Sequence, residues 1–251
     1  MLAGMSSEYY IRLERGNATG VSESILDAIS RALQLDDAER THLFNLARGA
    51  NSSLRPSRLR SPKQTGIKPL LRQTIEAMDN VPVFIQNGRL DGVAANALGE
   101  ALFAPLMDSE VSFMNAARFV FLDQRAQEFY PEWEKVAQEI VPVLRAEAGK
   151  SPFDRALTDL VGELSTRSEE FRQLWASQNV REHRTGVKKI HHPVVGDLDL
   201  QFEVMTLASE PSLQMFVFSA ERGSPSQIAL QLLANLSATF KDRSSTNEPA
   251  I

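Results

Sequence analysis

A cluster of histidines is the first group in this sequence that could take part in metal chemistry. His191 and His192 are adjacent, and His183 lies a few residues before them. Neighbouring side chains of a β-strand point to opposite faces of a sheet, so the adjacent pair cannot chelate one ion as two histidines on a helix face can. We therefore expect no metal site. One histidine of the pair should instead turn toward the covered side of a sheet, where a hydrogen bond satisfies its ring.

Asn115 and Arg118 lie three residues apart, which places them on one face of a predicted helix. Two interpretations remain open for this pair. In the first, Asn115 caps the helix and Arg118 is solvated or pairs with a carboxylate at the edge of the core. In the second, the pair forms the polar end of an apolar ligand pocket. Arg118 is flanked by apolar residues, and a guanidinium in such surroundings needs an anion, which a ligand carboxylate could supply.

Aromatic and methionine side chains are abundant in the segments expected to surround Arg118. They are Phe113, Met114, Phe119, Phe121, Phe202, Met205, Met215, Phe216 and Phe218. These side chains could simply fill the core, or they could form the apolar wall of a pocket. Under the pocket interpretation we select Phe119, Phe202 and Phe216 as lining residues.

Several classes of function lack their usual sequence features. The chain has no Cys, no Gly-x-Ser-x-Gly, no phosphate-binding glycine loop and no His-Glu-x-x-His. We therefore expect neither an enzyme nor a bound cofactor. No window approaches the roughly 20 apolar residues of a membrane span, and no signal peptide is visible at the start. The expected protein is soluble and cytoplasmic, without a membrane partner.

The strands that would carry the pocket wall are clearest in residues 186–221. Leu198, Leu200 and Phe202 alternate with polar residues, and this period of two predicts a strand with one wet face. Turn residues on both sides predict an antiparallel three-stranded meander. Residues 83–85 and 90–94 form two more strands around a predicted hairpin turn at Asn87-Gly88. The fold class is therefore α+β, with a five-stranded antiparallel sheet covered by helices.

Helical patterns and capping residues fill most of the remaining chain. Predicted helices cover 8–15, a segment after Ser22, a segment after Asp36 or Asp37, 68–79, Asn96–Phe103, most of 110–180 and a final helix from Ser224-Pro225. Within them, Pro142 predicts a kink or a break. The final helix should turn Ile228, Leu232, Leu233 and Leu236 inward. Residues 241–251 are polar and predict a flexible tail.

Charge is distributed unevenly along the chain. Residues 1–75 carry 11 basic against 7 acidic side chains, whereas the remainder carries 16 against 25. The stretch from Thr41 to Ile75 contains no acidic residue at all. A basic front on an acidic body indicates contact with a polyanion at the front. A solvated linker that happens to be rich in arginine remains the alternative.

Residues 2–16, Leu-Ala-Gly-Met-Ser-Ser-Glu-Tyr-Tyr-Ile-Arg-Leu-Glu-Arg-Gly, resemble the end of a helix-turn-helix of the Xre type. The resemblance makes residues 6–15 a recognition helix for double-stranded DNA. The residues that it implies in DNA binding are Ser6, Ser7, Tyr9, Arg12 and Arg15. The family's head has five helices and this chain begins at the turn before the third. We therefore expect a short all-α remnant whose first two helices are missing, and a chain that binds DNA weakly or not at all.

The sequence of the whole chain up to about Ala238 resembles the MmyB-like regulators. In these proteins a DNA-binding head is joined to a PAS-like ligand-binding domain. Asn115 and Arg118 match the family's Asn-x-x-Arg-x-x-Phe segment, and His192 matches the start of its His-Pro-x-x-Gly segment. The resemblance implies that these three residues contact a fatty-acid-like molecule. It also implies a head at 1–50, a linker at 51–67 and a PAS-like domain at 68–240.

These features together predict a one-component transcription regulator that senses a fatty-acid-like apolar small molecule and can form a homodimer. The alternative is a ligand-binding or dimerising sensor module that has lost DNA binding through N-terminal truncation.

Overall fold

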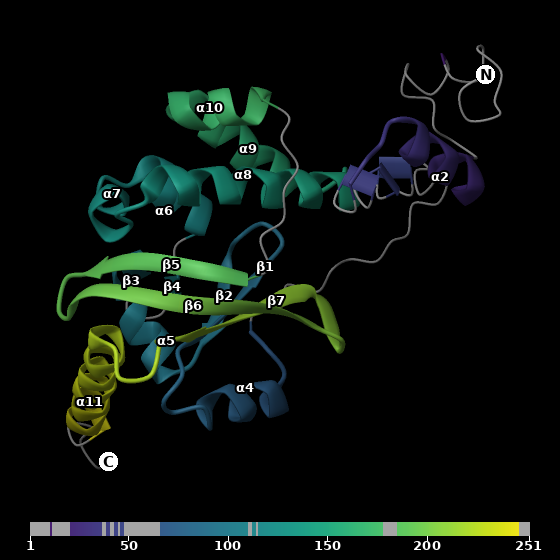
Figure 1. Cartoon of the computed structure of the whole chain (residues 1–251). Helices are drawn as coiled ribbons and strands as arrows, with labels where there is room; N and C mark the ends of the chain where they lie inside the picture. The colour runs from purple at the N-terminus through teal and green to yellow at the C-terminus, as the bar shows by residue number, and fades with distance from the viewer. Residues whose placement is uncertain are drawn as a thin grey trace. The chain divides into compact units, whose positions relative to one another are not determined.

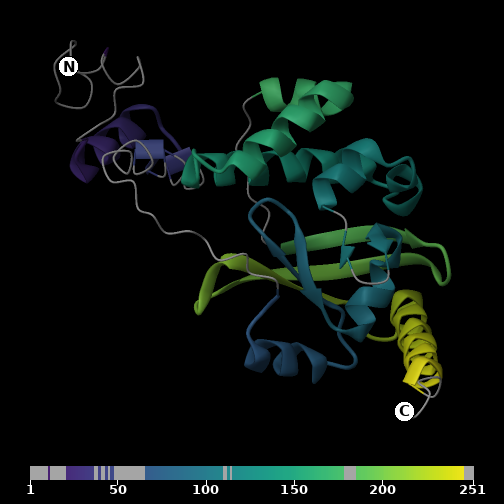
Figure 2. The ribbon, with the colours of Figure 1, turned by 180° about the vertical axis from the view of Figure 1, so that it is seen from behind.

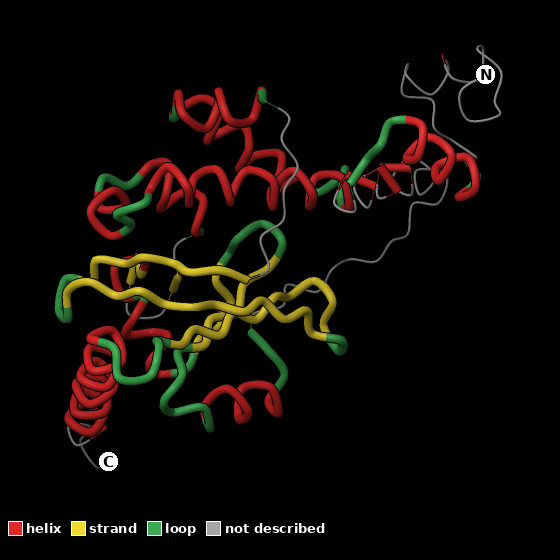
Figure 3. Tube along the Cα trace, viewed as in Figure 1, coloured by secondary structure: helices red, strands yellow, loops and turns green. Residues whose placement is uncertain are grey.

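The computed structural model of the chain describes most of its residues (Figure 1). The described residues are 11, 21–36, 39–40, 43–44, 46–47, 66–109, 112–113, 115–177 and 185–245. They fall into two compact units: a sheet unit drawn from residues 63–138 and 183–251, and a helical unit drawn from 1–62 and 139–182. Each unit is described by itself. Helices and strands both contribute, which confirms the α+β class (Figure 3).

A five-stranded antiparallel sheet is the centre of the sheet unit. Its strands are β1 (Val83–Asn87), β2 (Gly92–Ala95), β5 (Thr185–His192), β6 (Gly196–Leu207) and β7 (Glu210–Ser219). They lie in the order β2-β1-β7-β6-β5, and every neighbouring pair is antiparallel. The predicted sheet is therefore confirmed. The meander β5-β6-β7 joins the β1-β2 hairpin through β7.

Helices accompany the sheet on both faces. Those of the sheet unit are α4 (Pro69–Glu76), α5 (Ala97–Leu102), α6 (Ala116–Leu122), α7 (Arg125–Phe129) and α11 (Pro225–Ser245), with a 3₁₀ turn at Ala104–Leu106 and a small hairpin of β3 (Met107–Ser109) and β4 (Ser112–Phe113). Figures 1 and 2 show α4 on one side of the sheet and α6 and α7 on the other. In the helical unit lie α2 (Glu23–Ala32), α9 (Arg155–Arg167) and α10 (Glu169–Ala176), while α8 (Trp133–Lys150) begins in one unit and ends in the other.

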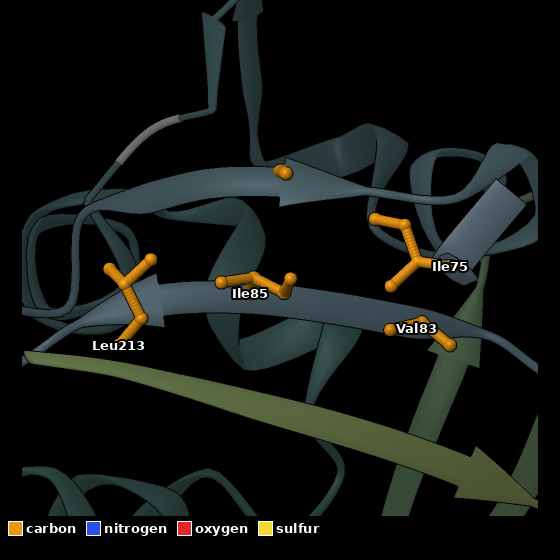
Figure 4. Packing of buried hydrophobic residues seen from close by; sticks show 5 residues of the cluster. Ile75, Val83, Ile85 and Leu213 are labelled. Carbon is orange, nitrogen blue, oxygen red and sulfur yellow. The ribbon is translucent and has the colours of Figure 1, made fainter. Parts of the chain in front are cut away.

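An aliphatic core lies between α4 and one face of the sheet (Figure 4). It comprises the buried side chains of Ile75, Val83, Ile85, Ala94 and Leu213. Val83 and Ile85 are two residues apart on β1, so their side chains lie on the same face of the sheet. Ile75 of α4 packs against them. The intervening Phe84 points to the opposite face, where it belongs to a different cluster.

Asn96 fastens α5 to the edge of the sheet and confirms the predicted cap. Its Oδ1 accepts hydrogen bonds from the backbone N–H groups of Gly99 (2.8 Å) and Val83 (3.0 Å). Its Nδ2 donates to the carbonyl oxygens of Met78 (2.8 Å) and Val81 (2.7 Å). One buried amide therefore satisfies four backbone groups from three segments of the chain.

The β1–β2 turn differs from the predicted Asn87-Gly88 turn. The residue with positive φ is Leu90 (φ 67), whereas Gly88 does not have one. The Asn87 N–H donates to the Asp91 carbonyl at 3.1 Å, and the Asn87 side chain accepts from the Asp91 N–H at 3.0 Å. The loop is thus longer than a two-residue turn. Burial of the Leu90 side chain offsets the cost of its backbone conformation.

Two predictions about helices are corrected in part. Of the kink or break predicted at Pro142, the break is absent, because α8 runs through this residue from Trp133 to Lys150. Ile228 and Leu232 do not turn inward: they are 65% and 50% exposed. Leu233 is buried as predicted, and Leu230 joins it on the buried side of α11. The backbone of α11 continues to Ser245, within the stretch whose composition predicts a tail.

The helical unit confirms one predicted cap and specifies its residue. The Asp36 carboxylate accepts from the Glu39 N–H at 2.8 Å, and the Glu39 carboxylate accepts from the Asp36 N–H at 2.9 Å. This reciprocal pair is a capping box, so Asp36 rather than Asp37 begins that helical segment. Ser22 occupies the N-cap of α2 as expected, but its side chain makes no capping hydrogen bond.

Two helical glycines give opposite predictions for the same substitution. A Cβ at Gly99 would lie 2.2 Å from the Val83 carbonyl oxygen, whereas a Cβ at Gly162 would meet nothing within 4 Å. Gly99→Ala should therefore lower the free energy of unfolding by about 1–3 kcal/mol, because helix and strand must separate. Gly162→Ala should raise it by about 0.5–1 kcal/mol through helix propensity. Urea denaturation followed by circular dichroism measures both, and equal effects would contradict the close α5–β1 contact.

Candidate functional site

A continuous aromatic cluster covers the face of the sheet opposite the aliphatic core. Its members are Phe84, Phe103, Phe119, Phe129, Tyr130, Phe202, Phe216 and Phe218. Neighbouring ring centroids are 4.8 to 6.5 Å apart. Most of the pairs are tilted or edge-to-face, the arrangements that aromatic quadrupoles favour. The cluster is therefore a single apolar wall with contributions from strands and helices.

The register of the sheet explains how the strands present their rings together. Phe84 of β1 lies opposite Phe216 of β7, and Phe202 of β6 lies opposite Phe218 of β7. Phe216 and Phe218 are two residues apart, so all four rings reach one face. Phe103, at the end of α5, bridges the sheet to the helices because it contacts Phe84, Phe218 and Phe129.

Lys188 places a cation against this aromatic wall, and our sequence analysis missed it. Its Nζ lies 5.3 Å from the ring centroid of Phe202 and 5.9 Å from that of Tyr130, within reach of a cation–π interaction. The signal was available in the alternation of β5, because Lys188 shares the covered face with Ile190 and His192. Gly186 belongs to the same row, and a Cβ there would lie 3.2 Å from the Phe202 ring.

An ion pair holds the α7–α8 segment over β5, beside these rings. Lys189 Nζ lies 2.9 Å from a carboxylate oxygen of Glu132, two residues beyond Tyr130. Hydrogen bonds from Lys189 and Lys135 lower the pKa of Glu132, and the bond to Glu132 raises the pKa of Lys189. Both groups are solvent-accessible, so the pair orients the segment rather than supplying much stability.

His192 occupies the covered side of the sheet, as predicted, and is only 2% exposed. Its Nδ1 accepts from the Val194 N–H at 3.2 Å, so its Nε2–H donates to the Ala101 carbonyl at 3.0 Å. Burial is the main factor that lowers its pKa, and the proximity of His191 contributes. His191 faces the opposite way and pairs with Asp197 at 2.5 Å. His192 is therefore a neutral imidazole that ties β5 to α5.

Asn115 is a buried helix cap that also ties α6 to the β1–β2 turn. Its Oδ1 accepts from the N–H groups of Ala117 (3.0 Å) and Arg118 (3.1 Å). Its Nδ2 donates to the Arg89 carbonyl (2.7 Å) and to an Asp91 carboxylate oxygen (2.8 Å). Both Nδ2 hydrogens are thus engaged within the protein. The capping interpretation describes Asn115 well.

The structure separates two of the polar residues that sequence reasoning grouped. His192 pairs with Gly196 at the start of β6, whereas the β1–β2 turn that holds Asn115 lies beside the other end of that strand. The 12 residues of β6 place these ends on the order of 30 Å apart. One ligand head group therefore cannot contact both Asn115 and His192. Arg118 is half-buried on α6, close to Asn115 in sequence.

The predicted aromatic residues lie in the cluster. Phe119 and Phe202 are buried and Phe216 is partly buried. Phe119 contacts the rings of Phe129 and Tyr130, and Phe202 contacts the ring of Phe216. The predicted DNA-binding residues Ser6, Ser7, Tyr9, Arg12 and Arg15 lie outside the described residues.

The described part of the chain lacks two kinds of feature. No group of three or more His, Cys, Asp or Glu side chains within it is placed to hold a metal ion. None of its helices combines the length and apolar composition needed to cross a bilayer.

Stability near neutral pH should depend on His192. The pKa of His192 is lowered in the folded state. Below about pH 6.5 the unfolded chain therefore binds a proton at this residue that the folded chain does not bind. Stability is therefore full above that pH and falls on acidification, by up to about 1.4 kcal/mol per pH unit. Urea titrations between pH 7.5 and 5.5 should show this slope in wild type and in His191→Gln. His192→Gln should flatten it, and an unchanged slope would contradict the buried neutral imidazole.

A comparison with protein families identifies the family of this chain. The family model described as the MmyB-like transcription regulator ligand binding domain matches residues 67–233, a range that contains the five-stranded sheet and the entire aromatic cluster. A search of curated proteins returned no match. The family is defined by a regulatory ligand-binding domain rather than by an enzymatic activity. Since the match covers well over half of the 251 residues, the chain belongs to the MmyB-like transcription regulators, and residues 67–233 are its ligand-binding domain.

Proposed function

We propose that this chain is a one-component transcription regulator that senses a fatty-acid-like molecule. The observation that carries the proposal is the continuous aromatic wall within the family-matched region. Each methylene of an acyl chain gains roughly 0.8 kcal/mol on leaving water, so a dozen methylenes can outweigh the cost of immobilising the ligand. An apolar body with one polar end is the ligand that such a surface suits.

The polar end of the ligand requires a cation, and Arg118 is the proposed partner of its carboxylate. The hydrogen-bonding atoms of His192 and the Nδ2 hydrogens of Asn115 are occupied by protein groups. Those two residues therefore support the site through its framework, in place of the direct contact that the family resemblance implies. Lys188, which lies over Phe202 and Tyr130, is the second cation that we propose as a contact of an anionic head group.

DNA binding completes the proposal at the other end of the chain. Residues 1–50 would form the helix-turn-helix head, 51–67 the linker and 68–240 the sensor. The acid-free stretch from Thr41 to Ile75 supports contact with phosphates near the head. A homodimer would present two such heads to paired half-sites.

Ligand specificity provides the first test. Fatty acids of medium or long chain should raise the melting temperature of the purified protein, measured by differential scanning fluorimetry. Arg118→Ala should weaken binding of the carboxylates about tenfold or more, because a charged hydrogen bond is worth about 1.5–3 kcal/mol. Binding of the matching alcohols should change little.

Arg125 provides the matched control for this experiment. It lies on the next helix, 5.8 Å from the Phe119 ring, but pairs with Asp123 at 2.6 Å at the surface. Arg125→Ala should leave the carboxylate preference intact. If Arg118→Ala weakens the binding of fatty acids and of the matching alcohols equally, Arg118 has a structural role. If only Lys188→Met removes the preference for carboxylates, Lys188 is the residue that binds the carboxylate.

Salt dependence provides the test of DNA binding. A chain supplied with the five-helix head that the family resemblance implies should shift its own promoter DNA in a gel. Its affinity should fall steeply between 50 and 200 mM salt, because phosphate contacts release counterions. Arg12→Ala should weaken binding and reduce the salt slope by about one. A DNA affinity that changes neither with salt nor with Arg12→Ala would instead favour a sensor module that does not act through this helix.

A further inference from the structure

The final helix, α11, has apolar side chains on two sides, and the residues that the structure describes cover only one of them. Leu230 and Leu233 are buried where α11 packs on α5 and β6. Ile228 and Leu232, one helical turn apart, form an exposed apolar stripe. Figures 1 and 2 show α11 at the edge of the sheet unit from both directions. A helix that is apolar on both sides is typical of a buried position, so the exposed stripe calls for a partner.

Hydrogen bonds at the start of α11 fix the helix about its axis. The Ser226 hydroxyl accepts from the Asp199 N–H of β6 at 2.9 Å. The Gln227 side chain accepts from the Gly223 N–H at 2.7 Å, and the Ser224 hydroxyl accepts from the Gln227 N–H at 3.2 Å. Ser226 faces the sheet. Ile228 follows it by two residues, more than half a turn around the helix, so the stripe faces away from the sheet. Turning Ile228 inward would break the contact with Asp199.

The charge pattern of this region restricts the class of partner. Residues 223–240 contain no Asp, Glu, Lys or Arg, although charged residues make up 24% of the chain. A nucleic acid requires a basic surface, and a membrane-surface helix normally carries Lys or Arg on its polar side. Neither class fits an uncharged stripe. The cores of protein–protein interfaces, in contrast, are depleted in charge.

A second copy of the same helix meets these requirements. In a twofold symmetric contact the same patch faces itself, so the partner is uncharged and aliphatic and its ridge spacing matches. An antiparallel arrangement also brings opposite ends of the two helix dipoles together. We propose that two copies of this chain associate through the Ile228–Leu232 stripes of their α11 helices. The proposal names the contact for the homodimer and does not depend on DNA or fatty acid binding.

The size of the stripe predicts a dimer of moderate affinity. α11 has 21 residues and is therefore about 31 Å long. One helix pair is smaller than a standard interface of about 800 Å² per partner, so association should be reversible and depend on concentration. Sedimentation velocity of the full chain should show monomer and dimer exchanging in the micromolar range.

Charged substitutions on the stripe test the contact. Leu232→Glu, and independently Ile228→Glu, should raise the dimer dissociation constant at least tenfold without changing the circular dichroism spectrum or the melting temperature of the monomer. Leu70→Glu on α4 is the matched control, because Leu70 is 75% exposed and lies on another surface. This control should dimerise as wild type does. A wild-type chain that remains monomeric, or a dimer that both stripe variants leave intact, would overturn the proposal.

The absence of cysteine from the chain permits a second readout without charged substitutions. Ile228→Cys and Leu232→Cys each introduce a single thiol. A short bis-maleimide should link two copies of at least one of these variants within minutes at micromolar concentration. Leu70→Cys, treated identically, should stay monomeric on a denaturing gel. Equal linking of all three variants, or linking of none, would contradict a contact at α11.

Discussion

The alternation of side chains across one antiparallel sheet is the constraint on which the structure depends. Along β1, Val83 and Ile85 reach the face covered by α4, while Phe84 reaches the other. The register carries this division across β7 and β6, so the rings of three strands gather in one layer and the aliphatic core beside α4 forms the other. A shift of one residue in any strand would exchange the layers. The aromatic face is thus a consequence of register, and the helices cover it.

Buried polar side chains fasten those helices in place. Asn96 joins α5 to β1, Asn115 joins α6 to the β1–β2 turn, and His192 joins α5 to β5. Each satisfies backbone groups that burial would otherwise leave without partners. Polar residues that match a ligand-binding pattern in the sequence can therefore serve a structural purpose. They hold the covering helices against the sheet.

Local patterns predicted much of this fold, and tertiary contacts decided the rest. The strand alternation, the Asn96 and Asp36 caps and the burial of His192 follow from neighbouring residues. The orientation of α11 does not, because leucines on two sides allow two rotations and the Ser226–Asp199 contact selects one. The turn at Leu90 depends on burial of its side chain, which Asn87-Gly88 cannot reveal. Lys188 was overlooked because a lysine on an edge strand usually indicates solvent.

The proposed function requires that the aromatic face of the sheet binds an apolar ligand. Native mass spectrometry of the full chain tests it most directly, because the ligand is weighed in place. The protein purified from cells, or incubated with fatty acids of graded length, should carry one lipid-sized adduct that disappears on denaturation. Replacing Phe202 with Ala should reduce the adduct, because it removes a ring that contacts both Phe216 and Phe218 in the wall. A bare mass under every one of these conditions would contradict the account and leave the aromatic cluster as core alone.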